Sequence, residues 1–163
     1  MNIYGHEINI AYSSFVFGDG AHETTRFLLY FLNRYADGKT VIDAGCGTGI
    51  LAIFAAKRGA RSVTAIDIDQ NAVECAKENI RLNEVDVEVY RTAIDALKIS
   101  ADIVTANFAR HEAMYLLPHM AKASNDLIIT TWYKEIPKEP LRDFEIVDCI
   151  EGVDYDCYVL RTA

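Results

Sequence analysis

A glycine-rich turn between residues 41 and 51 carries the residue types best suited to ligand binding. Gly45, Gly47 and Gly49 occupy every second position of a link between two segments. A short apolar run that ends at Asp43 precedes the link, and an apolar stretch of helical character follows it. Glycines let a backbone turn tightly and approach a ligand closely, and the helix that follows offers free N–H groups. Asp67 ends the next apolar run, near the spacing of a carboxylate that binds the hydroxyl pair of a ribose. The pattern predicts a nucleoside-containing ligand at the carboxyl ends of two neighbouring strands.

The glycine spacing and the charge of Asp43 indicate which nucleoside. A dinucleotide site favours Gly-x-Gly-x-x-Gly, which seats a pyrophosphate on a helix N-terminus, whereas this turn is Gly-x-Gly-x-Gly. The carboxylate of Asp43 would repel a pyrophosphate, but it suits a ligand with an ammonium and a sulfonium group. We therefore predict S-adenosylmethionine (SAM) as cofactor and S-adenosylhomocysteine as its product. A turn that serves only to connect strand and helix is the alternative.

The elements that must position this turn alternate between strand-like and helix-like patterns. Helices are expected over residues 24–35, 48–57, 70–82 and 111–122, and strands over residues 40–43, 62–67, 87–90, 102–106 and 126–131. Two further strands, 144–150 and 155–160, are separated by a link too short for a parallel crossover, so they should pair antiparallel. This order is typical of an α/β domain with a mostly parallel sheet.

Length, charge and cysteine content narrow the possibilities. The 163 residues suit one domain, 1–163, with residues 1–15 as an N-terminal extension. A net charge of −8 argues against binding along nucleic-acid phosphates, and it fits either a cationic substrate or a role in solubility alone. No apolar run approaches the roughly 18 residues of a membrane span and the N-terminus does not resemble a signal peptide, so we expect a cytoplasmic protein. The four cysteines form no Cys-x-x-Cys pair, so no metal site is expected.

From the glycine turn to Asp67 the chain resembles the class I SAM-dependent methyltransferases. The resemblance implies a Rossmann-like, three-layer α/β/α fold, with a seven-stranded, mostly parallel sheet whose last strand is antiparallel. It also implies that Asp43 and the three glycines line the methionine end of SAM, that Asp67 binds the ribose, and that residues 92–94 lie along the adenine ring.

Residues 17–25, Phe-Gly-Asp-Gly-Ala-His-Glu-Thr-Thr, are similar to the Phe-Gly-Thr-Gly-x-His-x-Thr-Thr segment of the PrmA-type ribosomal protein methyltransferases. This narrower resemblance extends over roughly residues 15–131 and implies methylation of protein amino groups. The separate substrate-recognition domain of that family has no counterpart in these residues, so we expect recognition to come from a partner or from the substrate's own fold. A simpler interpretation of the segment is a helix cap with a loop, and His22 is expected either to hold that loop in place or to touch SAM. The residues expected to bind the cofactor are Phe17, Gly18, Thr24, Thr25, Asp43, Gly45, Cys46, Gly47, Thr48, Gly49, Asp67, Ile68, Thr92, Ala93 and Asn107.

Asn107, at the end of the strand 102–106, is the candidate catalytic residue. Methyl transfer from a sulfonium mainly requires alignment of the nucleophile and exclusion of water. An acceptor amine must be neutral, because an ammonium has no lone pair, and the amide of Asn107 could accept a hydrogen bond from it. Capping the next helix is the alternative role. Phe-Ala-Arg follows Asn107 instead of the Pro-Pro-Tyr of enzymes that methylate bases, which argues against nucleic acid as the acceptor.

The sequence thus predicts a SAM-dependent methyltransferase that acts on a protein amino group, either a lysine or an N-terminal amine. A small-molecule methyltransferase and a non-catalytic SAM-binding partner subunit are the alternatives. Four other residues lie near the predicted site. Arg110 and His111 either contact substrate or are solvated, and Trp132 and Tyr133 either line the acceptor pocket or pack in the core.

Overall fold

The computed structural model describes residues 1–11 and 16–162, and it begins with a small hairpin that the sequence did not predict. β1 (Asn2–Ile3) pairs antiparallel with β2 (His6–Glu7). The N-terminal amino group donates a hydrogen bond to the carbonyl of Ile8 at 2.8 Å, and the side chain of Ile8 is fully buried. The described part of the expected N-terminal extension therefore packs against the rest of the chain, whereas residues 12–15 lie outside the described residues.

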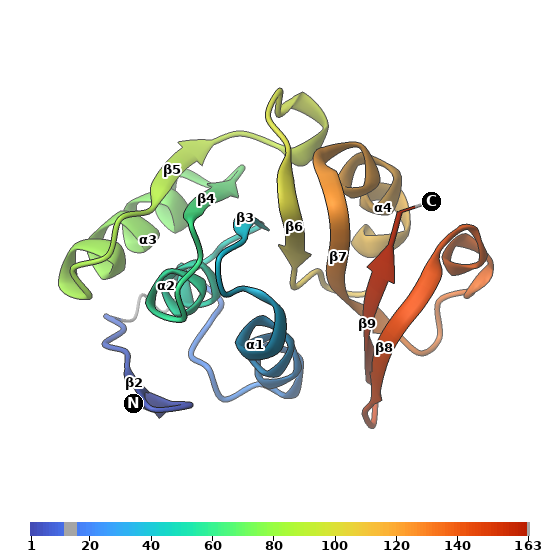
Figure 1. Cartoon of the computed structure of the whole chain (residues 1–163), viewed down its shortest axis with the longest axis horizontal. Helices are drawn as coiled ribbons and strands as arrows, with labels where there is room; N and C mark the ends of the chain where they lie inside the picture. The colour runs from blue at the N-terminus through green and yellow to red at the C-terminus, as the bar shows by residue number, and fades with distance from the viewer. Residues whose placement is uncertain (12–15, 163) are drawn as a thin grey trace.

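Seven strands form one twisted sheet (Figure 1). They are β3 (Thr40–Ala44), β4 (Ser62–Asp67), β5 (Glu88–Arg91), β6 (Ala101–Ala106), β7 (Ser124–Tyr133), β8 (Glu145–Glu151) and β9 (Tyr155–Arg161). Their order across the sheet is β5-β4-β3-β6-β7-β9-β8. The strands from β3 to β7 are parallel, and β9 lies antiparallel between β7 and β8. The predicted sheet, including its antiparallel last strand, is confirmed.

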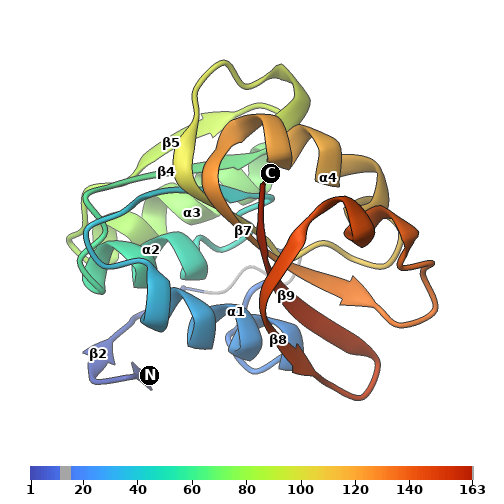
Figure 2. The same ribbon diagram turned by 45° about the vertical axis from the view of Figure 1, so that its right-hand side comes forward.

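Helices cover both faces of this sheet. α1 (Glu23–Tyr35), α2 (Ile50–Lys57) and α3 (Gln70–Leu82) pack on one face. The other face is covered by α4 (Glu112–Ala123) and two short 3-10 helices, η1 (Ile94–Ala96) and η2 (Glu139–Asp143). Figure 2 shows α1 and α2 on one side of the sheet and α4 on the other. Each face has its own buried apolar cluster, which confirms the predicted three-layer arrangement.

Most predicted boundaries lie within one residue of the observed ones, and the start of α2 and both ends of β7 differ by two. α2 begins at Ile50 instead of Thr48, because Gly47 and Gly49 both have positive φ angles, +53° and +83°, and so lie in the turn before the helix. β7 continues to Tyr133, because its pairing with β9 extends that far. Trp132 is consequently a residue of β7 with no exposed surface and packs in the core, so it does not line an acceptor pocket.

Candidate active site

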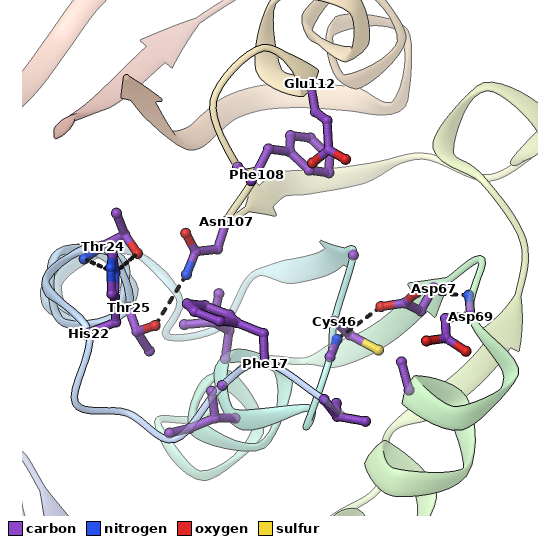
Figure 3. A pocket seen from close by; sticks show the side chains of 18 of the residues that line it. Phe17, His22, Thr24, Thr25, Cys46, Asp67, Asp69, Asn107, Phe108 and Glu112 are labelled. Carbon is purple, nitrogen blue, oxygen red and sulfur yellow. Dashed lines mark hydrogen bonds between the residues drawn. The ribbon is translucent and has the colours of Figure 1, made fainter. Parts of the chain in front are cut away.

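The strand order reverses beside β3, because β4 and β5 follow on one side of it and β6 and β7 on the other. Such a reversal leaves a crevice at the carboxyl ends of the strands. Two cavities of about 390 and 310 Å³ lie there. They share part of their lining and therefore form two parts of one site, of which Figure 3 shows the larger. The shared residues are Gly45, Asp67, Asn107, Phe108 and Glu112.

The glycine turn packs directly against the segment that precedes α1. A Cβ atom on Gly47 would collide with the carbonyl oxygen of Phe17, and the backbone N–H of Thr48 donates to that same oxygen at 3.0 Å. The hydroxyl of Thr48 donates to the carbonyl of Gly18 at 2.7 Å. Gly49 has a different task, since a Cβ there would come within 3.3 Å of Ala76 on α3. The first two contacts bring residues 17–18 over the turn as one wall of the larger cavity.

Asp67, at the end of β4, ties two backbone segments together. Its carboxylate accepts a hydrogen bond from the N–H of Gly47 at 3.0 Å and another from the N–H of Asp69 at 3.0 Å. Asp67 also lines both cavities, and Figure 3 shows it beside Cys46. A carboxylate has about four acceptor positions, so two remain for ligand hydroxyls while the turn stays in place.

Asp43 is an unpartnered acid beneath the turn. Its side chain is 1% exposed, and neither carboxylate oxygen has a hydrogen-bond partner among the described residues. Burial raises the pKa of Asp43 to about 7. The backbone N–H of Ala52 favours the ionised carboxylate and so lowers this pKa, whereas the nearby charge of Asp67 raises it further. The hydroxyl of Thr105, which is in register with Asp43 on β6, also has no partner in the described part of the chain. Buried acceptors of this kind need a donor or a cation nearby, so the site fits the positively charged cofactor predicted from the sequence.

The first turn of α1 forms the wall opposite Asp67. The imidazole of His22 caps the helix, because its Nδ1 accepts the backbone N–H of Thr24 at 3.3 Å and contacts the Thr24 hydroxyl at 2.7 Å. The amide nitrogen of Asn107 donates to the hydroxyl of Thr25 at 3.1 Å, as Figure 3 shows. This bond fixes the side-chain orientation of Asn107 and leaves its Oδ1 as an acceptor at the cavity. His22 therefore holds the start of α1 in place, and its ring also lines the larger cavity, where it can reach a ligand.

Most of the sequence-predicted site residues line the cavities, but three do not. The larger cavity is lined by Phe17, Gly18, Thr24, Thr25, Gly45, Cys46, Gly47, Asp67 and Asn107, and the smaller one adds Ile68, Thr92 and Ala93. Neither cavity is lined by Asp43, Thr48 or Gly49. Those three lie behind the surface, where Asp43 supplies charge and the other two shape the turn.

Several lining residues were not singled out from the sequence. Glu112, in the first turn of α4, lines both cavities. The sequence carries no signal for it, because an acidic residue at a helix N-terminus is explained by the helix dipole alone. Tyr155, at the start of β9, reaches the larger cavity, and its ring lies 6.1 Å from that of His22. Arg110 and His111 line neither cavity, and the Arg110 guanidinium stacks over the ring of Tyr133 at 5.3 Å.

Residues 1–11 and 16–162 contain neither a metal-binding cluster nor a membrane-spanning helix. Within those ranges, no group of three or more side chains is arranged to hold a metal ion. No helix in the same ranges is long and apolar enough to cross a membrane.

The strand order, the glycine turn and the acid at the end of β4 define a class I methyltransferase fold, and solved structures agree. A ribosomal protein L11 methylase from Lactobacillus delbrueckii subsp. bulgaricus superimposes with a TM-score of 0.81 and 29% identity, covering 91% of this chain and 82% of that one. A Thermus thermophilus 16S rRNA N2 G1207 methyltransferase in complex with AdoMet and guanosine gives a TM-score of 0.85. It is 19% identical and the match covers 100% of this chain and 49% of that one, so this likeness concerns the fold alone.

The chain belongs to the PrmA family, described as ribosomal protein L11 methyltransferase, whose model matches residues 6–137. The ribosomal protein L11 methyltransferase of Acetivibrio thermocellus is 43% identical over 156 residues, which cover 89% of this chain and 50% of that protein. The Thermotoga petrophila protein of the same name is 44% identical over 111 residues, 67% of this chain and 42% of its own length. The chain thus spans half or less of the length of these relatives. The family expected from residues 17–25 is confirmed.

Proposed function

We propose that this chain binds SAM in the two joined cavities and transfers its methyl group to an amino group of a protein, either a lysine or an N-terminal amine. The names of its relatives support a protein acceptor, and ribosomal protein L11 is the first one to test. The observation that carries the proposal is the bond from Asn107 to Thr25, because it leaves a fixed amide oxygen at the cavity.

The residues of the site match the parts of this cofactor. The carboxylate of Asp67 would accept the ribose hydroxyls, and the glycine turn offers a surface without side chains for the methionine end. Asp43 would balance the positive charge from behind the turn. The adenine would lie in the smaller cavity, between Ile68 and the turn that follows β5. When bound, SAM supplies an electrophilic methyl group on its sulfonium.

This chain's own residues orient the acceptor and exclude water. The Oδ1 atom of Asn107 accepts a hydrogen bond from the neutral amine and so directs the nitrogen lone pair, while Thr25 holds the amide. A lysine amine has a pKa near 10.4, so its proton must leave before transfer. The rings of Phe17 and Tyr155 line the larger cavity beside the His22 ring, with centroids 5.6 and 6.1 Å from it, and would shield the site from solvent.

Incubation with radiolabelled SAM tests this function. Purified chain, recombinant ribosomal protein L11 and a cell extract would each be assayed, with Asn107→Ala as the comparison. Label on a protein, lost in the variant, supports the proposal. Label only on a small metabolite would favour the alternative of a small-molecule enzyme. Binding of S-adenosylhomocysteine without any labelled product would favour the alternative of a non-catalytic subunit.

A further inference from the structure

Asn79 of α3 and Asn83, the C-cap residue of that helix, are buried although their chemistry favours water. Asn79 has no exposed surface and Asn83 is 6% exposed. They are four residues apart, one turn from each other at the end of the helix. Buried amides are costly unless hydrogen-bonded, so the partners of each one indicate its role.

Asn79 joins two separate segments of the chain. Its Oδ1 accepts the backbone N–H of Ala11 at 2.8 Å, and its Nδ2 donates to the carbonyl of Thr48 at 2.9 Å. The same nitrogen also contacts the sulfur of Cys75 at 3.6 Å. The amide group makes both backbone bonds because it carries an acceptor oxygen and a donor nitrogen side by side. An aspartate of the same shape only accepts hydrogen bonds when ionised, and a leucine makes none.

Thr48 carries this contact to the cavity wall. On its other side, its N–H and its hydroxyl donate to the carbonyls of Phe17 and Gly18, both of which line the larger cavity. The residue before Thr48 is Gly47, whose N–H is bound by Asp67. A continuous series of hydrogen bonds therefore runs from Asn79 through Thr48 to the wall formed by residues 17–18.

We propose that Asn79 is a positioning residue for the cofactor cavity, although it does not line it. It fixes the carbonyl of Thr48, and with it the place where the glycine turn meets Phe17 and Gly18. The expected effect of Asn79 on cofactor affinity rests on the proposed function, because it is measured as binding of S-adenosylhomocysteine. The expected effect of Asn79 on the order of the glycine turn rests on the hydrogen bonds alone.

Asn83 supplies a matched control. Its Oδ1 accepts the N–H of Asn9 at 2.9 Å, and its Nδ2 donates to the carbonyls of Asn9 at 2.6 Å and Asn79 at 2.7 Å. It thus holds the N-terminal segment with the same chemistry and similar burial, but these hydrogen bonds go to Asn9 and Asn79 and not to the glycine turn. Asn79→Asp and Asn83→Asp are accordingly comparable in their effect on folding and differ in their effect on the cavity.

The experiment combines calorimetry with hydrogen exchange. Both variants should lower Tm, but Asn79→Asp should weaken S-adenosylhomocysteine binding by about tenfold or more, against about twofold or less for Asn83→Asp. The affinity of Asn79→Asp relative to the wild type should recover as the pH falls, because a protonated carboxyl regains a donor. The backbone amides of Gly47 and Thr48 should exchange faster in Asn79→Asp alone. If that variant does not fold, Asn79→Ser, which keeps one hydroxyl, should show the same differences to a smaller extent.

The outcomes separate the inference from the proposed function. Equal losses of affinity in both variants, or unchanged exchange at Thr48, would overturn the role of Asn79. A wild-type chain that fails to bind S-adenosylhomocysteine would refute the proposed function. In that case the exchange of Thr48 would still decide whether Asn79 holds the turn.

Discussion

The unpartnered carboxyl group of Asp43 makes both stability and cofactor binding depend on pH. Its folded-state pKa of about 7 lies above the value near 3.9 expected in the unfolded chain. The folded protein therefore binds the extra proton, and the free energy of unfolding falls as the pH rises from about 4 to about 7. A difference of roughly three pKa units corresponds to about 4 kcal/mol of lost stability above pH 7.

Replacing Asp43 with asparagine removes the ionisable group with little change in size. We expect the variant to gain stability relative to the wild type as the pH rises, by up to about 4 kcal/mol at pH 8 and by little at pH 4. Urea unfolding of both proteins at several pH values measures this difference. Groups common to both proteins cancel, so parallel stability curves across pH 4 to 8 would refute the argument.

The same group links cofactor affinity to pH. Because SAM carries a net positive charge, it should favour the ionised form of Asp43, and its affinity should rise as the pH approaches 7, by at most about tenfold per pH unit. S-adenosylhomocysteine lacks the sulfonium charge and should show a weaker pH dependence. In Asp43→Asn the difference between the two ligands should largely disappear. Calorimetry in buffers of different ionisation heat would also detect the proton released on binding.

Three further substitutions test the site. Asp67→Ala should weaken S-adenosylhomocysteine binding by about tenfold or more, whereas Asp86→Asn, an exposed control before β5, should not; equal calorimetric affinities would remove Asp67 from the ribose site. Asn107→Ala should leave that affinity within about twofold but reduce kcat by about tenfold or more, and unaltered turnover would exclude it from catalysis. Gly47→Ala should lower the free energy of unfolding by about 1–3 kcal/mol, because the new methyl group meets the carbonyl of Phe17; an unchanged urea midpoint would contradict that contact.

The fold and the cofactor end of the site could be predicted from local patterns in the sequence. Alternating apolar runs locate the sheet, and the glycine turn with Asp67 marks the cofactor end, because both features arise within single strand–turn–helix units. The bond between Asn107 and Thr25 joins residues 82 positions apart, and no local pattern records it. Glu112 and Tyr155 could not be predicted for a similar reason. The start of α4 explains an acidic residue at position 112, and the start of β9 after the hairpin turn explains a tyrosine at position 155, without reference to the cavity.

The two acids at the ends of β3 and β4 differ in what they contribute to the free protein. Asp67 accepts two backbone N–H groups, so it orders the glycine turn before any ligand is present. Asp43 has no partner at full hydrogen-bonding distance among the described residues, the backbone of Ala52 stabilises its charge only in part, and it is fully buried, so its ionised form destabilises the fold until a cation lies nearby. A site that is ordered at one carboxylate and uncompensated at the other should select a cation of defined shape, because only a ligand that fits the turn brings its positive charge close to Asp43.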